Sequence, residues 1–147
     1  MSQNPELIRG QRVIDDRGAV GFVNEFAFTG VKRFYTVTNH SIGFVRAWHG
    51  HKHEAKYCTA VTGALLVCCI AIDDWSDPSA DLPVHRFVLS EHTPAVLHVP
   101  PGYINGFMSL TVDAKIMFFS TSTLEESMKD DIRFPARRWD PWHVEER

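Results

Sequence analysis

The feature that most constrains the fold is a series of short runs rich in Val, Phe, Tyr and Thr, separated by Gly, Pro, Asp or Asn. β-Branched and aromatic residues favour strands, and the separating residues favour turns. Short strands at regular spacing are typical of antiparallel sandwiches and barrels. The runs cover residues 19–28, 31–37, 43–50, 56–63, 64–72, 84–89, 95–100, 105–110 and 114–120. The pattern predicts an all-β fold.

One helix start interrupts this pattern near the end of the chain. Thr123 is followed three residues later by Glu126, which is the spacing of a capping box. No repeat, linker or low-complexity segment divides the 147 residues. We therefore expect a single domain over residues 1–147, a β-barrel with a short C-terminal helix.

Composition excludes several functional classes. A formal net charge of -3 gives no electrostatic footprint for nucleic acid or an anionic membrane. The longest apolar run, residues 64–72, is too short to span a bilayer. The first residues lack the apolar segment of a secretory signal, and Cys58, Cys68 and Cys69 form no disulfide framework. We expect a cytoplasmic protein with reduced, buried thiols.

The stretch RAWHGHKHEAKY, residues 46–57, places His49, His51 and His53 on alternate positions. Residues two apart share one face of a strand, so these imidazoles would project together into a barrel. Buried imidazoles are costly unless they are hydrogen-bonded. The pattern leaves open a metal site, an acid–base pair, or hydrogen-bonded core and rim histidines. His53, beside Glu54 near a turn, is the weakest member of the set.

The spacing around these histidines resembles a known signature. Between Gly43 and Gly63, the positions of His49, His51 and Lys56 match the first motif of the cupin superfamily. The stretch PPGYINGF, residues 100–107, resembles the second cupin motif. The resemblance implies the cupin double-stranded β-helix, a jelly-roll barrel.

Two residues depart from the pattern of metal-binding cupins. Those proteins carry a glutamate at the position of Lys56 and a histidine at the position of Asn105. An ammonium repels a divalent cation, and an amide is a poor substitute for imidazole. We therefore expect neither a metal nor another cofactor. A metal-dependent cupin, with His53 and Glu54 restoring the coordination shell, is an alternative.

Without a metal, the same cluster suits proton transfer. Imidazole titrates near neutral pH, so a histidine can remove a proton from carbon. A cation such as Lys56 disfavours the imidazolium and stabilises a developing enolate oxygen. This combination fits proton abstraction next to a carbonyl group.

The chain also resembles a branch of the cupins that acts on nucleotide-linked 4-keto-6-deoxy sugars, over about residues 12–135. The dTDP-4-dehydrorhamnose 3,5-epimerases carry D-x-R-G, N-x-S, R-G-x-H, a lysine and P-x-G-F-x-H-G-F; this chain has DDRG (15–18), NHS (39–41), RAWH (46–49), Lys56 and PPGYINGF. The sugar 3,4-ketoisomerases carry K-R-x-Y and R-G-x-H-A-H-K; this chain has KRFY (32–35) and RAWHGHK (46–52).

The resemblance implies a role for each matching residue. His49 is implied as the base and His51 as the partner acid or base, while Lys56 and Tyr35 position or polarise the carbonyl. The residues implied to bind substrate are Arg17, Arg46, Asn39, Ser41, Lys52 and Asn105. Arg17 is implied to contact the diphosphate and to be able to reach a neighbouring subunit, since the resemblance also implies a homodimer.

These matches predict a metal-independent isomerase of a nucleotide-linked 4-keto-6-deoxyhexose, with a dTDP-linked sugar as the expected substrate. The motif HGHK favours a 3,4-ketoisomerase, because two histidines on one strand can shuttle protons through an enediol. The tyrosine acid of the epimerases is replaced around Leu124. A 3- or 3,5-epimerase is next in order, since the C-terminal half resembles the epimerases. A non-catalytic cupin that binds sugar nucleotides or carbohydrates is the alternative from another class.

Overall fold

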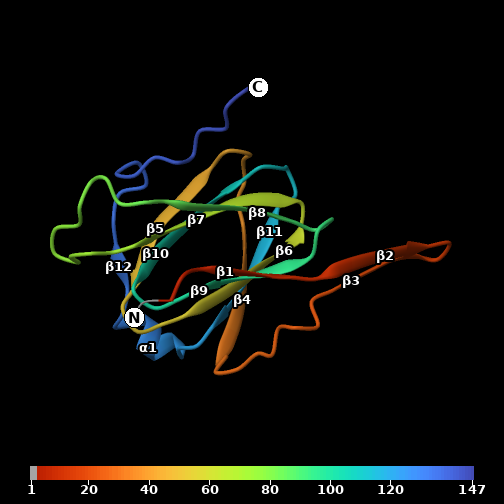
Figure 1. Cartoon of the computed structure of the whole chain (residues 1–147), viewed down its shortest axis with the longest axis horizontal. Coiled ribbons are helices and arrows are strands. Elements are labelled where there is room, and N and C mark those ends of the chain that lie inside the picture. The colour runs from red at the N-terminus through yellow and green to blue at the C-terminus, as the bar shows by residue number, and fades with distance from the viewer. Residues whose placement is uncertain (1–2) are drawn as a thin grey trace.

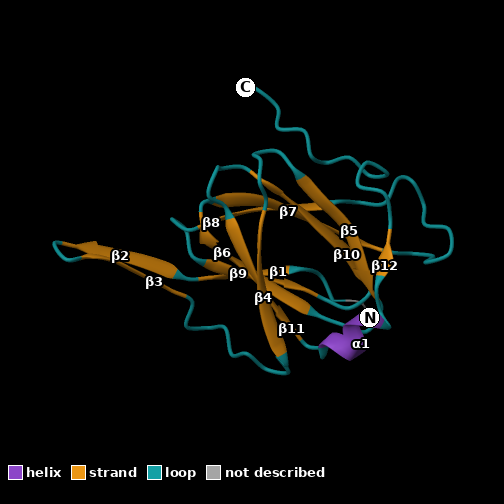
Figure 2. Ribbon diagram, turned by 180° about the vertical axis from the view of Figure 1, so that it is seen from behind, coloured by secondary structure: helices purple, strands orange, loops and turns teal. Residues whose placement is uncertain are grey.

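Two five-stranded antiparallel sheets face each other in the computed structural model, which describes residues 3–147 (Figures 1 and 2). The first sheet has the order β1-β9-β6-β11-β4, and the second has the order β12-β5-β10-β7-β8. The strands are β1 (Glu6–Arg9), β2 (Gln11–Asp15), β3 (Gly18–Phe22), β4 (Arg33–Thr38), β5 (Val45–His51), β6 (Lys56–Thr62), β7 (Ala64–Ala71), β8 (His85–Ser90), β9 (Ala95–Val99), β10 (Tyr103–Ser109), β11 (Lys115–Ser120) and β12 (Ile132–Arg133). The predicted all-β jelly-roll fold is confirmed.

The helix α1 (Leu124–Met128) lies where the sequence predicts it. The Thr123 side chain accepts a hydrogen bond from the backbone of Glu126, and the Glu126 side chain accepts one from the backbone of Thr123. No helix in residues 3–147 is long and apolar enough to cross a membrane.

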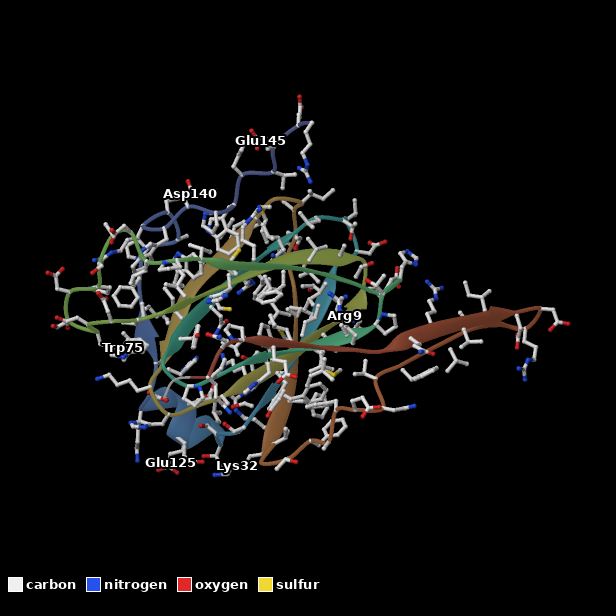
Figure 3. The ribbon with its side chains drawn as sticks, in the orientation of Figure 1. Arg9, Lys32, Trp75, Glu125, Asp140 and Glu145 are labelled. Carbon is white, nitrogen blue, oxygen red and sulfur yellow. The ribbon has the colours of Figure 1, made fainter. Side chains whose placement is uncertain are left out.

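The hairpin of β2 and β3 extends away from the two sheets (Figures 1 and 2). Side chains project from it into solvent, as Figure 3 shows, and Val13, Ile14 and Val20 are 53%, 70% and 64% exposed. The strand predicted over residues 19–28 was wrong in its second half. The run at residues 19–28 ends as a strand at Phe22, and the following loop packs Phe26 on Tyr57 through aromatic rings, with a centroid distance of 5.0 Å.

The two faces of the second sheet are buried differently. Between the sheets, β7 and β10 place Leu65, Val67 and Phe107 in one apolar core. On the opposite face, Trp48 of β5 packs with Trp139 and Trp142 from the C-terminal segment, which covers this side of the sheet. Alternation along each strand therefore separates an inner core from an outer, tryptophan-rich layer.

The three cysteines are free and buried, Cys58 and Cys69 in the core between the sheets and Cys68 in the outer layer. Burial raises the pKa of Cys58 to about 12, so the thiol stays protonated at neutral pH. The structure thus gives these residues a packing role, as the sequence predicts.

Candidate active site

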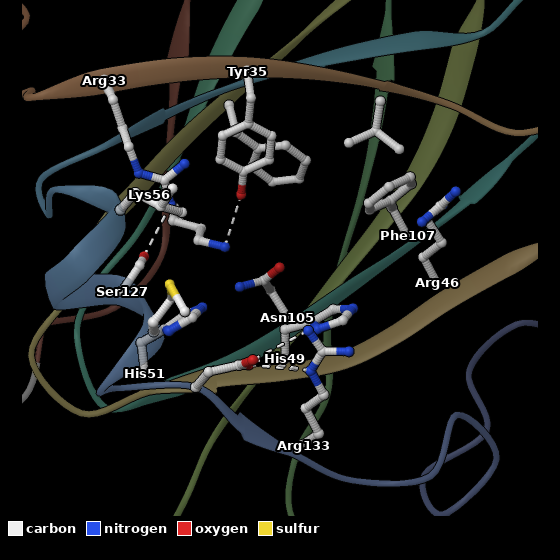
Figure 4. Close-up of a pocket in the computed structure, with 15 residues that line it drawn as sticks. Arg33, Tyr35, Arg46, His49, His51, Lys56, Asn105, Phe107, Ser127 and Arg133 are labelled. Atoms are coloured by element: carbon white, nitrogen blue, oxygen red, sulfur yellow. Dashed lines mark hydrogen bonds and ion pairs between the residues drawn. The ribbon is translucent and has the colours of Figure 1, made fainter.

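A cavity of about 320 Å³ lies between the two sheets. Its lining comes from β4, β6 and β11 on one side, from β5, β10 and β12 on the other, and from the region of α1 (Figure 4). The lining residues are Arg33, Tyr35, Val37, Arg46, His49, His51, Lys56, Asn105, Phe107, Phe118, Leu124, Ser127, Met128, Asp131 and Arg133.

Most of the residues singled out in the sequence lie around this cavity. All four predicted catalytic residues line it, together with two of the predicted substrate-binding residues: Tyr35, His49, His51, Lys56, Arg46 and Asn105. The alternation of β5 brings both histidines to the inner face, as expected for residues two apart. Their chemical roles remain predictions.

Asn39 does not line the cavity but holds a residue that does. Its Oδ1 accepts a hydrogen bond of 2.7 Å from Nε of Arg46. Its Nδ2 donates to Oγ of Ser109 at 2.9 Å and to the carbonyl of Phe44 at 3.2 Å. Asn39 therefore fixes the guanidinium of Arg46 at the cavity.

Besides Asn39, three more predicted substrate-binding residues lie outside the cavity lining. Arg17 is at the tip of the β2–β3 hairpin, where its guanidinium binds Asp15 at 2.6 Å. Lys52 follows β5 and lies 6.0 Å from the ring centroid of Trp75, and Ser41 is exposed in the loop before β5. Substrate contacts by these residues remain predictions, and Arg17 would need a neighbouring subunit.

His49 is set in the sheet opposite Asn105 of β10 and Arg133 of β12. Burial and the positive charges of Arg133 and Lys56 lower its pKa to about 4. The imidazole is therefore neutral at physiological pH and has a lone pair available to accept a proton.

Asp131 and Arg133 are site residues that the sequence analysis missed. The two side chains form an ion pair, with Arg133 Nε 3.1 Å from Oδ2 of Asp131. Burial opposes ionisation of this carboxyl, but the hydrogen bond and charge of Arg133 hold the pKa of Asp131 below its usual value. The short strand β12 gives almost no local signal, so only its pairing with β5 brings these residues beside His49.

His51 has both ring nitrogens turned toward the protein. Nδ1 lies 2.7 Å from the carbonyl of Asp130, an acceptor, so this nitrogen carries a proton. Nε2 faces Oε2 of Glu54 at 3.6 Å. Burial and the Lys56 ammonium lower the pKa of His51, while the Glu54 carboxylate opposes them.

Asp130 organises the loop that follows β5. Its carboxylate accepts backbone hydrogen bonds from Lys52, His53 and Glu54 at 2.8, 2.9 and 3.0 Å. Burial opposes ionisation, but these hydrogen bonds lower the pKa of Asp130. The same residue thus holds the His51 ring through its carbonyl and shapes the loop that carries Glu54.

Lys56 and Tyr35 form a pair on the opposite side of the cavity from His49 (Figure 4). Lys56 Nζ donates a hydrogen bond of 2.9 Å to Oη of Tyr35, and the lysine is only 8% exposed. The tyrosine ring stacks on Phe118 with a centroid distance of 5.2 Å. Because the lysine occupies an acceptor position of Oη, the proton of the tyrosine hydroxyl is available to another acceptor.

Glu54 is a second buried acid that the sequence analysis did not place in the site. Its side chain is fully buried, and Oε1 accepts a hydrogen bond from Oγ of Ser127. Oε2 lies 3.5 Å from Nζ of Lys56. The sequence suggested Glu54 only as a substitute metal ligand, but no group of three His, Cys, Asp or Glu side chains in residues 3–147 is arranged to hold a metal ion.

The charge of the cavity lining suits an anion. Four cationic side chains line it, from Arg33, Arg46, Lys56 and Arg133, against the single carboxylate of Asp131. Asp131 is already paired with Arg133. The excess positive charge would attract and hold a phosphorylated ligand.

Comparison with known proteins places this site in a family. The family model described as dTDP-4-dehydrorhamnose 3,5-epimerase matches residues 6–139. The chain belongs to this family. No curated protein matches the sequence.

Solved structures of two kinds of enzyme share the fold. The dTDP-4-dehydrorhamnose 3,5-epimerase of Bacillus anthracis, with TDP and pyrophosphate bound, is 18% identical with a TM-score of 0.77, over 97% of this chain and 87% of that one. The epimerase of Mycobacterium tuberculosis is 18% identical with a TM-score of 0.74, over 94% and 71%. A 3,4-ketoisomerase of Thermoanaerobacterium thermosaccharolyticum in complex with TDP is 18% identical with a TM-score of 0.68, over 95% of both chains.

The family match confirms the predicted enzyme class. This protein is a dTDP-sugar epimerase or isomerase with a cupin jelly-roll fold. At these identities the structural likeness supports the fold alone. The choice between epimerase and ketoisomerase therefore depends on the arrangement of the cavity.

Proposed function

We propose that this protein epimerises a dTDP-linked 4-keto-6-deoxyhexose beside its ketone, with His49 as the base and Tyr35 as the acid. The main support for this proposal is that the two side chains come from opposite sheets and face each other across the cavity (Figure 4). Loss of a proton beside a ketone gives a planar enolate. A base on one face of this plane and an acid on the other invert the carbon.

Lys56 supports both partners of this reaction. Its ammonium, buried beside Oη of Tyr35, can stabilise the negative charge that develops on the enolate oxygen. The same charge helps to keep His49 neutral and able to accept the proton. In this proposal Lys56 replaces the metal of other cupins as the source of positive charge.

The nucleotide end of the substrate requires anion binding. Arg46, held by Asn39, and Arg33 on β4 line the cavity and can donate several hydrogen bonds to a diphosphate. The amide of Asn105 points into the cavity and can hydrogen-bond a sugar hydroxyl (Figure 4). These contacts favour a sugar nucleotide over a neutral sugar.

The 3,4-ketoisomerase predicted from HGHK is the second candidate. His49 and His51 both line the cavity from β5, as a two-histidine shuttle on one face of the sugar requires. The placement of the His51 ring weighs against it, because Nδ1 contacts the carbonyl of Asp130 and the buried Nε2 faces Glu54 at 3.6 Å.

Isotope exchange separates the two reactions. In deuterated water with dTDP-4-keto-6-deoxyglucose, an epimerase gives deuterium and inverted configuration at C3, C5 or both. A ketoisomerase instead gives a 3-keto product with a new hydroxyl at C4. NMR identifies the outcome, and His49→Gln serves as the inactive control.

The other candidate classes give different results in the same assay. No exchange at either carbon with dTDP, GDP, UDP or CDP sugars would refute the isomerase proposal. Nucleotide-induced rises in melting temperature without turnover would then support a binding protein. Stoichiometric metal in the purified protein, with activity lost on chelation, would support a metal-dependent cupin.

We also propose a homodimer in which the β2–β3 hairpin packs on a second copy. A two-stranded hairpin is marginally stable alone, and Val13, Ile14 and Val20 are exposed on this one. The pairing would bring Arg17 toward the neighbouring subunit. Light scattering should give a dimer mass for the wild type and a monomer mass for Ile14→Lys; a monomeric wild type would refute the proposal.

A further inference from the structure

The strongest feature not used by the reaction above is an unmatched pair of buried polar atoms. Nε2 of His51 and Oε2 of Glu54 are both buried and have no hydrogen-bond partner within residues 3–147. They face each other at 3.6 Å. Buried polar atoms in folded proteins are almost always paired, so this arrangement needs an explanation.

The hydrogen-bond donors around the pair restrict where protons lie. Nδ1 of His51 donates to the carbonyl of Asp130, so Nε2 of the neutral ring has only a lone pair. An ionised Glu54 also offers only lone pairs to it. Two acceptors would then face each other in a buried site, which is unfavourable. One additional proton between them satisfies both atoms.

Glu54 also contacts other charged and polar groups. Lys56 lies 3.5 Å from Oε2, and Ser127 donates to Oε1 while accepting from Arg33 at 2.9 Å. Asp130 binds the backbone N–H of Glu54 at 3.0 Å. The positive charges of Lys56 and Arg33 therefore balance the carboxylates of Glu54 and Asp130, and an additional proton leaves this cluster positive.

We propose that Glu54 and His51 hold one shared proton and form the proton reservoir that resupplies Tyr35 through Lys56. The path runs from Oε2 of Glu54 to Nζ of Lys56 over 3.5 Å and on to Oη of Tyr35 over 2.9 Å. This role rests on the proposed function, because Tyr35 must first give its proton to substrate. Glu54 is a positioning residue, since it acts only through Lys56.

The proton balance of the path is complete. Tyr35 gives its hydroxyl proton to the enolate carbon, and Nζ of Lys56 gives a proton to the resulting phenolate. The reservoir gives its shared proton to Nζ, which restores the ammonium. His49 meanwhile holds the proton taken from the substrate and releases it to water, and the reservoir recovers one proton from water.

The shared proton can be tested without substrate. Neutron diffraction from crystals of the full-length deuterated protein at neutral pH should locate one deuteron between His51 Nε2 and Glu54 Oε2. Absence of that deuteron would overturn the proposal. This measurement stands even if no nucleotide sugar is turned over, so it separates failure of the reservoir from failure of the proposed function.

The relay is tested by separating proton removal from proton return. Glu54→Gln preserves the shape of the side chain but cannot pass a proton on. Product formation should fall about 100-fold, while exchange of deuterium into unreacted substrate, which needs only His49, should fall less than about threefold. Glu125→Gln, at an exposed carboxylate of α1, should leave both rates unchanged.

The ratio of exchange to product distinguishes a relay from a structural role. A variant that simply unfolds loses both activities together. In a Glu54→Gln protein with the melting temperature of the wild type, unchanged product formation or an equal loss of exchange and product would overturn the relay.

Discussion

Strand β5 presents opposite chemistry on its two faces. On the inner face, His49 and His51 border a cavity with several charged side chains. On the outer face, Trp48 is fully buried against Trp139 and Trp142, and Gly50 lies so close to Trp75 that an added Cβ would be 2.6 Å from its ring. The same seven residues thus serve both a reactive site and a dry packing layer.

The comparison teaches how the cavity is kept rigid. Buried charges cost stability, so the inner face depends on an apolar layer elsewhere to hold the strand in place. Trp48 Nε1 donates to the carbonyl of Trp139 at 3.3 Å, which ties β5 to the C-terminal segment. Substitutions on the inner face should therefore alter activity, and those on the outer face should alter stability.

The largest expected effect is on the inner face. His49→Gln should lower turnover about 1000-fold, equivalent to about 4 kcal/mol of barrier, because the base is lost. The thermal midpoint should change little, since the histidine is uncharged in the folded protein. Steady-state kinetics and calorimetry check both points. An unfolded variant would contradict the expectation that inner-face substitutions alter activity and outer-face substitutions alter stability.

Next is the outer face. Trp139→Ala should lower the free energy of unfolding by about 3–4 kcal/mol, because it leaves a cavity beside Trp48 and removes the hydrogen bond to Ser79. Urea titration followed by circular dichroism measures this. Phe34→Ala, at a position 66% exposed, is the matched control and should cost less than about 0.5 kcal/mol.

A smaller effect is expected at the wall opposite His49. Tyr35→Phe keeps the ring on Phe118 but removes the hydroxyl, so product formation should fall about 100-fold. Tyr57→Phe, whose ring does not line the cavity, should have normal activity. Full activity in Tyr35→Phe would show that Tyr35 is not the acid of the proposed epimerase.

The smallest expected effect is the pH dependence of stability. His49 has a pKa of about 4 in the folded protein and about 6.5 when unfolded. As pH falls from about 6.5 to 4, the unfolded chain binds a proton that the folded protein excludes, so stability falls by about 1–3 kcal/mol. Denaturant titrations at several pH values should show this loss in the wild type and a smaller loss in His49→Gln.

Much of the fold was predictable because strand signals are local. The β-type runs located most strands of both sheets, and the capping box located α1. Strands β1, β2 and β12 were missed. The hairpin strand β2 is wholly exposed and β12 has two residues, so neither carries the apolar alternation that marks a buried strand.

Site residues were predictable only where they belong to a sequence motif or follow the two-residue alternation of a strand. His49, His51 and Lys56 follow from spacing within one stretch, and Tyr35 follows from resemblance. Glu54 was not recognised because it lies in a loop beyond the end of β5, and a loop has no regular alternation of buried and exposed residues from which burial could be predicted. Its partner Ser127 is 73 residues away.

By itself, the sequence determined the class of fold, the shared face of His49 and His51 and the replacement of metal ligands by Lys56 and Asn105, but not the place of His53, which is exposed beyond the end of β5. These features depend on residues close together in the chain. The tertiary structure decided which polar groups meet, because Asp130 reaches His51 across 79 positions and β12 must pair with β5 before Arg133 lies beside His49. Such contacts follow from strand order and register, which short-range patterns do not encode.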